Sequence, residues 1–304
     1  MQFNDLLKRH NIDPSSVLML RHTPKEKELR RVIKQLAGEK PDLFNAFQQW
    51  HGADAEKKVQ QAAYVASFIG NKPNQALFVG LYKIDGWQPL TAEEFAEKPE
   101  IKELHQVYGM NQFTGEDGRS HVLFFDLKLM DFYRHWSGRL IIDWPPPAIQ
   151  WSRWAARGEF TINNISVDSQ FDEELPPWDK ISFTYNQLKT LPRNWQTALE
   201  HWRGIYYIFD TSDRKAYVGS AYGQANIMGR WRVYAETGDG GNVNMAGRNP
   251  ENYVFSILER VSPDMTPTEI QRIEHSWMDR LHTRKYGLNH APAGVADESA
   301  NDEE

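Results

Sequence analysis

The spacing of apolar residues divides the chain into a helical beginning, a β-rich middle and a mixed C-terminal part. A first helix is predicted at 25–36 by the spacing of Leu29, Val32, Ile33 and Leu36, and similar patterns predict helices at 42–50 and 55–67. Short β-branched and aromatic runs then predict strands at 76–84, 121–129, 138–144, 160–166 and 180–188. The pattern therefore predicts an α+β region in which helices accompany a β-rich sheet or barrel.

The pattern changes again near residue 194, where a short helix is predicted at about 194–202. Two strands follow at 204–210 and 215–221, joined by a polar turn of hairpin size. A helix comes next, in which Arg230 and Tyr234 are four residues apart and share one face, and the glycine-rich stretch 238–242 ends it.

A third strand of this part is predicted at 252–261. The sequence Thr266-Pro267-Thr268-Glu269 has the N-cap, the first-turn proline and the glutamate of a capping box. A last helix is therefore predicted from this point to about residue 285.

Composition narrows the class of protein. The chain has 304 residues, of which 40% are hydrophobic and 25% charged, as in soluble globular proteins. It contains no cysteine, which excludes disulfides, zinc ribbons and thiol nucleophiles, and leaves oxygen or imidazole ligands for any metal. Because no apolar run reaches the length of a membrane span and no secretory signal is found, we expect a cytoplasmic protein without a membrane partner.

The formal net charge of −6 does not exclude a nucleic-acid partner. Five acidic residues and no basic ones lie within the last fourteen residues, 291–304. A segment this polar and like-charged is expected to be a disordered acidic tail. The rest of the chain is close to neutral, so the net charge says little about what the folded part binds.

Five motif elements occur in order over about 85 residues: GIY at 204–206, YVG at 217–219, Arg230, Glu274 within E-x-x-W, and Asn289 within GLN. With this order and spacing, residues 198–290 resemble a GIY-YIG nuclease domain. The resemblance implies a small α/β domain with a three-stranded antiparallel sheet flanked by helices. It also implies metal-dependent hydrolysis of DNA phosphodiester bonds to 5′-phosphate and 3′-hydroxyl ends.

The chemistry of these residue types agrees with such a reaction. Glu274 is the carboxylate of the set, and a hard cation, Mg²⁺ or Mn²⁺, is commonly held by one or two carboxylates with water and phosphate oxygens. Arg230 offers a permanently charged planar fork to the scissile phosphate. These two residues are the expected metal ligand and the expected stabiliser of the transition state.

The general base is expected among the motif tyrosines, as the resemblance implies. A free tyrosine has a pKa of about 10 and is a poor base at neutral pH unless a cation lowers that pKa. Tyr206 is the first candidate and Tyr217 the second, with Tyr234 in a supporting role. Asn289 is expected to tie the end of the domain to the site. Where relatives with a glycine-rich loop often have histidine, this chain has Asp239, which is either a turn former or a further group near the metal.

The first 197 residues are expected to recognise DNA. The run ALFVGLYKI at 76–84 is weakly similar to the small barrel domains of the PUA and EVE type that read modified bases. The favoured function is a restriction-like endonuclease, with modified DNA as a candidate substrate, and cutting of both strands would favour a homodimer. A structure-specific repair or homing-type nuclease is the alternative within this chemistry, and a non-catalytic nucleic-acid-binding or regulatory protein is the alternative outside it.

Overall fold

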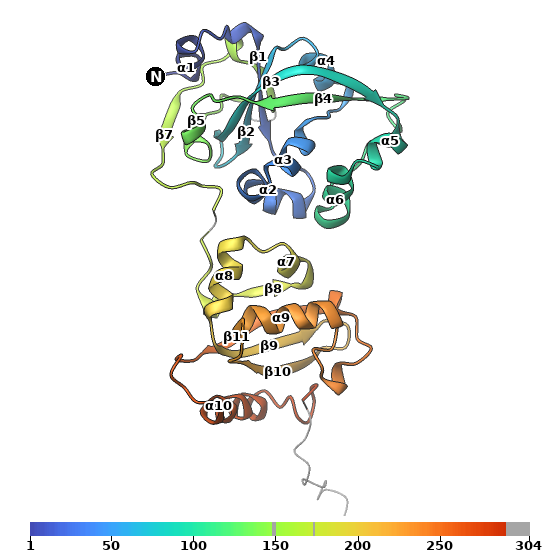
Figure 1. The fold of residues 1–304 in the computed structure, drawn as a ribbon, viewed down its shortest axis with the longest axis vertical. Coiled ribbons are helices and arrows are strands. Elements are labelled where there is room, and N and C mark those ends of the chain that lie inside the picture. Colours follow the sequence, from blue (N-terminus) through green and yellow to red (C-terminus); the bar gives the residue numbers. More distant parts are fainter. Residues whose placement is uncertain (148–149, 173, 290–304) are drawn as a thin grey trace, which may run out of the picture. The chain divides into compact units, whose positions relative to one another are not determined.

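The chain folds as two compact units, Met1–Glu173 and Glu174–Glu304 (Figure 1). The computed structural model describes residues 1–147, 150–172 and 174–289, so the expected acidic tail at 291–304 lies outside the described residues. The sequence pattern placed the boundary between 197 and 198. The segment before that point belongs to the second unit because its strand β8 (Ser182–Thr184) pairs with β11 (Tyr253–Arg260). Within the described ranges, no helix combines the length and apolarity needed to cross a membrane.

A seven-stranded mixed sheet forms the first unit. Its strand order is β6-β1-β2-β3-β5-β7, and β4 pairs with the long strand β3. The neighbours β1 and β2 are parallel, which requires a crossover connection, and helices between them supply it. The strands are β1 (Val17–His22), β2 (Tyr64–Gly70), β3 (Gln75–Leu90), β4 (Val122–Leu129), β5 (Leu140–Asp143), β6 (Ser152–Trp154) and β7 (Ile162–Ile165).

The helices of the first unit bury the predicted apolar stripe. Leu29, Val32, Ile33 and Leu36 are all buried in one core with residues of the other helices and of β2 and β3. This confirms the predicted first helix. The helices are α1 (Phe3–Arg9), α2 (Lys27–Glu39), α3 (Pro41–Gln48), α4 (Ala53–Val59), α5 (Ala92–Ala96) and α6 (Pro99–Tyr108).

Two element predictions in the first 197 residues were wrong. The helix predicted at 55–67 ends at Val59, and the chain then enters strand β2, whose middle residues are all buried. A fully buried strand has no alternation that separates it from a buried helix. The strand predicted at 180–188 is limited to β8, because Thr184 and Gln187 form a capping box that starts helix α7 (Tyr185–Lys189).

The second unit contains a four-stranded antiparallel sheet with the order β10-β9-β11-β8. The expected three strands are present and β8 adds a fourth, so the expectation of three strands was too low. The α+β class is confirmed. The elements that accompany β8, α7 and β11 are α8 (Arg193–His201), β9 (Gly204–Asp210), β10 (Lys215–Ala221), α9 (Asn226–Thr237) and α10 (Pro267–Arg280).

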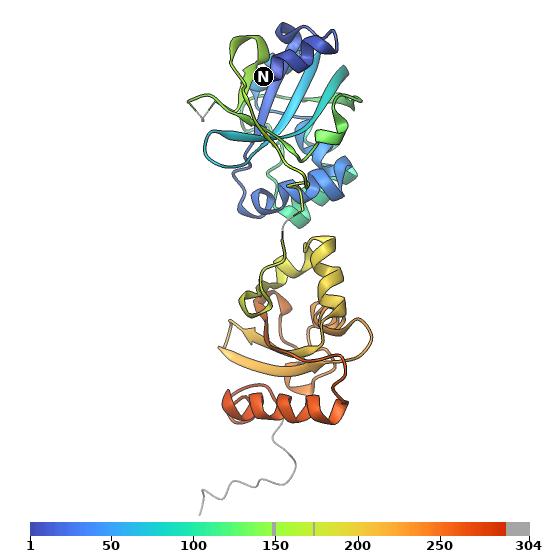
Figure 2. The ribbon, with the colours of Figure 1, turned by 90° about the vertical axis from the view of Figure 1, so that its left-hand side faces the viewer.

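Helices α9 and α10 cover opposite faces of this sheet (Figures 1 and 2). On one face, Trp231 of α9 packs against Phe255 of β11, with ring centroids 5.6 Å apart. On the other face, Ile270 of α10 shares a core with Ile205 and Val218. The capping box at Thr266 is present, but α10 ends at Arg280, earlier than predicted, and continues as turns. Strand β10 is left at an edge of the sheet, between the two helical layers.

Candidate active site

A groove of about 550 Å³ lies beside β10, the edge strand of the second unit. Helices on opposite faces of a sheet can reach a common space only around its edge, and the groove occupies this position. Of the six predicted site residues, Tyr217, Arg230, Tyr234 and Asn289 line it. Tyr206 and Glu274 do not line it but contact residues around it. The groove therefore draws residues from both faces of the sheet.

Three tyrosine rings gather on the α9 face. The Tyr206 hydroxyl donates to the Tyr234 hydroxyl at 3.4 Å, and both side chains are fully buried. The Tyr217 ring centroid lies 6.3 Å from that of Tyr206 and 5.8 Å from that of Tyr234. In the β9–β10 register Gly219 is the direct partner of Tyr206, and a Cβ atom at Gly219 would collide with the Tyr206 hydroxyl. The glycine of the YVG motif thus makes room for the tyrosine of the GIY motif.

Arg230 extends along this tyrosine cluster. Its Nε lies 3.5 Å from the Tyr206 hydroxyl, and its guanidinium carbon lies 5.6 Å from the centroid of the Tyr234 ring. The neighbouring Tyr206 hydroxyl raises the pKa of Arg230, so the guanidinium is charged throughout the neutral range. Burial raises the pKa of Tyr206 and of Tyr234 well above the usual value. Both buried hydroxyls are therefore protonated at neutral pH, and each can donate a hydrogen bond.

Glu274 reaches β10 from the α10 face. Ser220 of β10 donates its hydroxyl proton to Glu274 Oε2 at 2.6 Å. Burial raises the pKa of Glu274, whereas the Ser220 hydrogen bond and the positive charges of His275, Arg230 and Arg284 lower it. In the E-x-x-W element, Trp277 donates its indole N–H to Glu259 Oε2 of β11 at 2.8 Å, which fixes α10 on the sheet.

If activity requires ionised Glu274, Ser220 is expected to influence the pH at which activity is lost on the acid side of the pH–rate profile. Replacing Ser220 with alanine removes a hydrogen bond to the charged carboxylate, so the pKa of Glu274, already raised by burial, should rise further. Activity should then fall away at a higher pH than in the wild type, while the plateau at higher pH changes less. A pH–rate profile of the two proteins measures this shift. A Ser220→Ala profile superimposable on the wild type would contradict this role.

Asn289 covers the outer edge of β10. Its side-chain oxygen accepts the Val218 N–H at 3.0 Å, and its Nδ2 donates to the Val218 carbonyl at 2.8 Å. The Leu288 N–H also donates to the Ala216 carbonyl at 2.8 Å. An edge strand presents unpaired backbone N–H and C=O groups. The Asn289 amide forms hydrogen bonds with both backbone groups of one residue of β10, as a neighbouring strand would. Asn289 thus ties the segment after α10 to the strand that carries Tyr217.

Replacing Asn289 with alanine should destabilise the second unit by about 2 to 4 kcal/mol, because two backbone groups of Val218 lose their partners where Asn289 is 5% exposed. Calorimetry of the full chain measures this loss, and amide hydrogen exchange should quicken at Val218. The exposed Asn186 of α7 provides a control, since Asn186→Ala should change the stability by less than about 0.5 kcal/mol. Equal stability of both variants would show that the side-chain pairing contributes nothing.

The glycine-rich loop closes one side of the groove. Gly240 has a φ of +58°, and a Cβ atom there would collide with the Tyr234 ring, so the loop backbone lies directly on this ring. The Asp239 carboxylate accepts the Gly241 N–H at 2.8 Å, which is the bond of a turn former. Gly240, Gly241, Asn242 and Val243 line the groove.

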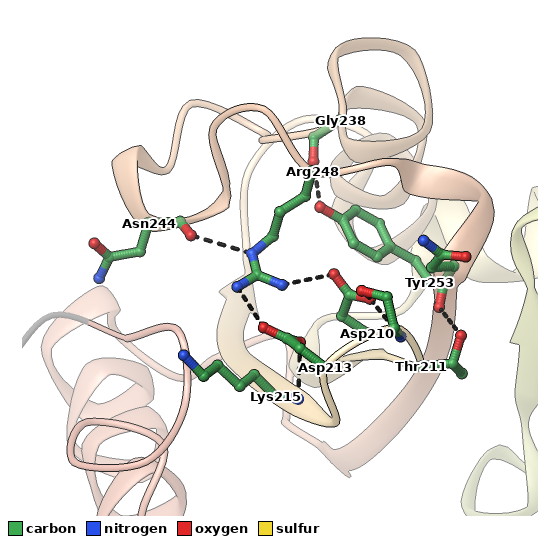
Figure 3. Close-up of polar contacts among 10 residues, drawn as sticks. Asp210, Thr211, Asp213, Lys215, Gly238, Asn244, Arg248 and Tyr253 are labelled. Carbon is green, nitrogen blue, oxygen red and sulfur yellow. Dashed lines mark hydrogen bonds and ion pairs between the residues drawn. The ribbon is translucent and has the colours of Figure 1, made fainter.

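An ion-pair network holds the far end of this loop (Figure 3). Arg248 contacts Asp210 Oδ2 through Nη1 at 2.7 Å and Asp213 Oδ2 through Nη2 at 2.8 Å. Arg248 lowers the pKa of Asp213, and the Asp210 side chain is 1% exposed. The Tyr253 hydroxyl also donates to the Gly238 carbonyl at 2.7 Å. The loop is therefore fastened to the β9–β10 hairpin.

Several residues of this site were not predicted from the sequence. Ser220 supports Glu274, Arg248 fastens the loop, and His275, Met278 and Arg284 line the groove. The position of Ser220, one residue after the YVG motif, is the one signal that could have pointed to it. The positions of the other four residues depend on how α10 and the glycine-rich loop pack, and no local sequence pattern indicates this packing.

Among the described residues, no group of three or more histidine, aspartate or glutamate side chains is arranged to hold a metal ion. Protein-family models give no match to the chain, and no curated protein matches it. Among solved structures, the chain is similar to the catalytic domain of the intron endonuclease I-TevI, in a mutant form. The sequence identity is 26%, the alignment covers 31% of this chain and 99% of that domain, and the TM-score is 0.26.

Proposed function

We propose that the protein is a metal-dependent DNA endonuclease whose active site is the groove beside β10. The observation that carries the proposal is the convergence of a guanidinium, three tyrosines and one carboxylate around a single edge strand. Arg230 contacts Tyr206 and Tyr234 on one face, and Glu274 is held by Ser220 from the other. Hydrolysis of a phosphodiester needs deprotonation of the attacking water, stabilisation of the extra negative charge and neutralisation of the leaving oxygen, and a base, a guanidinium and a carboxylate-bound metal can supply these.

Arg230 is proposed to bind the scissile phosphate. Arg230 lines the groove, where its Nε contacts the Tyr206 hydroxyl and its guanidinium lies over the Tyr234 ring. Because burial keeps the hydroxyls of both tyrosines protonated, they do not neutralise the guanidinium. A fixed positive charge in a partly buried site stabilises the extra negative charge of the transition state more than a mobile surface cation does.

Glu274 is proposed to hold the metal. A single carboxylate fits a cation such as Mg²⁺ or Mn²⁺, which keeps several waters and takes further oxygens from substrate phosphate. Ser220 binds one carboxylate oxygen, Oε2, and fixes the orientation of the side chain. A bound divalent cation would supply charge neutralisation at the phosphate and an acidified water molecule.

Tyr217 is proposed as the group that accepts the proton of the attacking water. Tyr206, the first candidate from the sequence, is fully buried and its pKa is raised, so it is better suited to stay protonated and hydrogen-bonded to Tyr234 beside Arg230. Tyr217 is partly exposed and lines the groove. The water oxygen bonds to phosphorus as its proton passes to the ionised Tyr217 oxygen, the bond from phosphorus to O3′ breaks, and O3′ takes up a proton from solvent, which leaves 5′-phosphate and 3′-hydroxyl ends.

The first unit is proposed to select the DNA, in a restriction-like reaction that acts on modified bases. A groove of about 550 Å³ offers little surface for reading a sequence, whereas the first unit has its own large sheet and core. Cleavage of both strands by one groove per chain would favour a homodimer.

Incubation of the full chain with supercoiled plasmid tests this proposal. We expect nicked or linear products in Mg²⁺ or Mn²⁺ and none in EDTA. The ends should be joined by DNA ligase without further treatment, as 5′-phosphate and 3′-hydroxyl ends are. Unmodified and cytosine-modified plasmids should be cut at different rates if the first unit reads modified bases. DNA binding without cleavage of any plasmid in either metal would overturn the proposal.

A further inference from the structure

We propose that Arg284 forms a second phosphate-binding position in the groove, for a backbone phosphate next to the scissile one in the same strand. This inference rests on the proposed function and deepens it. It predicts that the groove holds a length of DNA strand across the edge of β10, with one arginine from α9 and one from the turns after α10.

The position of Arg284 supports this role. Arg284 lies in the turns after α10 and lines the groove together with Arg230 of α9. The two residues come from segments on opposite faces of the sheet, and Asn289, which also lines the groove, is fixed to β10 by two hydrogen bonds. Arg284 therefore extends from a segment that is anchored to the same strand as the proposed active site.

The charges around the groove favour an anion. Its charged or titratable lining residues within the described part of the chain are Arg230, Arg284, His275, Tyr217 and Tyr234, and no carboxylate is among them. Two carboxylates lie nearby, Glu274 on Ser220 and Asp279 on Arg284, and neither of them lines the groove. The charges that the groove itself presents are therefore those of the two guanidinium groups, which match a phosphate-bearing strand.

Asp279 forms an ion pair with Arg284 and leaves other N–H donors of the guanidinium available to a ligand. The Asp279 carboxylate accepts from Arg284 Nη1 at 2.9 Å, and its side chain is 65% exposed. Because water reaches the Asp279 side of the pair, the ion pair is screened there even though Arg284 is 22% exposed, and a phosphate can compete for the guanidinium. Arginine has five N–H donors in a planar fork, and the pair with Asp279 uses Nη1. The ion pair orients the side chain before DNA arrives.

The test is DNA binding by the full chain in EDTA, where cleavage is blocked, measured with a labelled 20-bp duplex at several KCl concentrations. Arg284→Ala should weaken binding about tenfold. It should also reduce the slope of log K against log salt by about one, because one phosphate contact is lost. Arg284→Lys should keep most of the slope, which separates loss of charge from loss of packing.

Two further variants test whether the effect is specific to Arg284. Asp279→Asn removes the competing carboxylate and should strengthen binding about two- to fivefold, an effect of opposite sign. Arg280→Ala is the matched control: it removes the same charge from α10, but Arg280 lies over the Trp277 ring, 4.0 Å from its centroid, and does not line the groove. Its salt slope should equal that of the wild type.

The outcomes separate this inference from the proposed function. If the wild type binds and cuts DNA while Arg284→Ala binds with unchanged affinity and slope, the second phosphate position is wrong and the nuclease proposal stands. If the wild type neither binds nor cuts DNA, both are wrong. In cleavage assays Arg284→Ala should mainly raise KM, whereas loss of Arg230 should mainly lower kcat.

Discussion

Replacing Glu274 with glutamine should reduce Mg²⁺-dependent cleavage of plasmid DNA by about 10³-fold or more, because the proposed metal ligand loses its charge. Glutamine has nearly the same shape and keeps an oxygen that can accept the Ser220 hydrogen bond. The variant should therefore fold with wild-type stability. The rate is measured from the conversion of supercoiled to nicked plasmid, and calorimetric titration should show weaker Mg²⁺ binding.

Glu236 provides the control for this substitution. It is an exposed glutamate of α9 in the same unit, so Glu236→Gln changes the net charge equally and should cut DNA at the wild-type rate. Wild-type cleavage by Glu274→Gln would remove Glu274 from the metal site. Equal losses in both variants would point to a general effect of charge on DNA binding.

Helices and strands that are specified by residues close together in the chain could be predicted from the sequence. The strands at 204–210 and 215–221 are confirmed as β9 and β10, and the capping box at Thr266 is confirmed as the start of α10. These segments combine β-rich runs with a hairpin turn, or a cap with a first-turn proline, so few residues decide the structure. Strand β1 was missed because its short apolar run is buried on both sides, which gives no alternation.

The candidate site shows the same division between local and non-local signals. Arg230 and Tyr234 share a helix face by spacing alone, and the structure brings them together. The pairing of Asn289 with Val218 could not be derived from spacing, because it depends on how the segment after α10 returns to the edge of β10. Sequence patterns predicted the residues expected to carry out the chemistry. The hydrogen bonds that hold these residues in place depend on tertiary packing, which the patterns do not contain.

The burial of Tyr206 changes the proposed division of roles. A hydroxyl with no exposed surface cannot take a proton from water that enters the groove unless the site opens, and burial raises its pKa further above neutrality. The same burial suits a fixed hydrogen-bond donor beside Arg230. Tyr217→Phe should consequently cost more activity than Tyr206→Phe when conversion of supercoiled to nicked plasmid is measured.

Replacing Arg230 with alanine should lower kcat by about 10²- to 10³-fold with a smaller change in KM, because the guanidinium is proposed to act on charge that develops in the transition state. Arg230→Lys keeps the charge but loses the planar fork beside Tyr206 and should recover a small part of the rate. Arg232 is the matched control two residues along α9: it pairs with Glu200 and Gln196 at 2.7 Å, away from the groove. Arg232→Ala should leave kcat unchanged, and a loss of kcat equal to that of Arg230→Ala would show that the effect comes from α9 as a whole and not from a guanidinium at the phosphate.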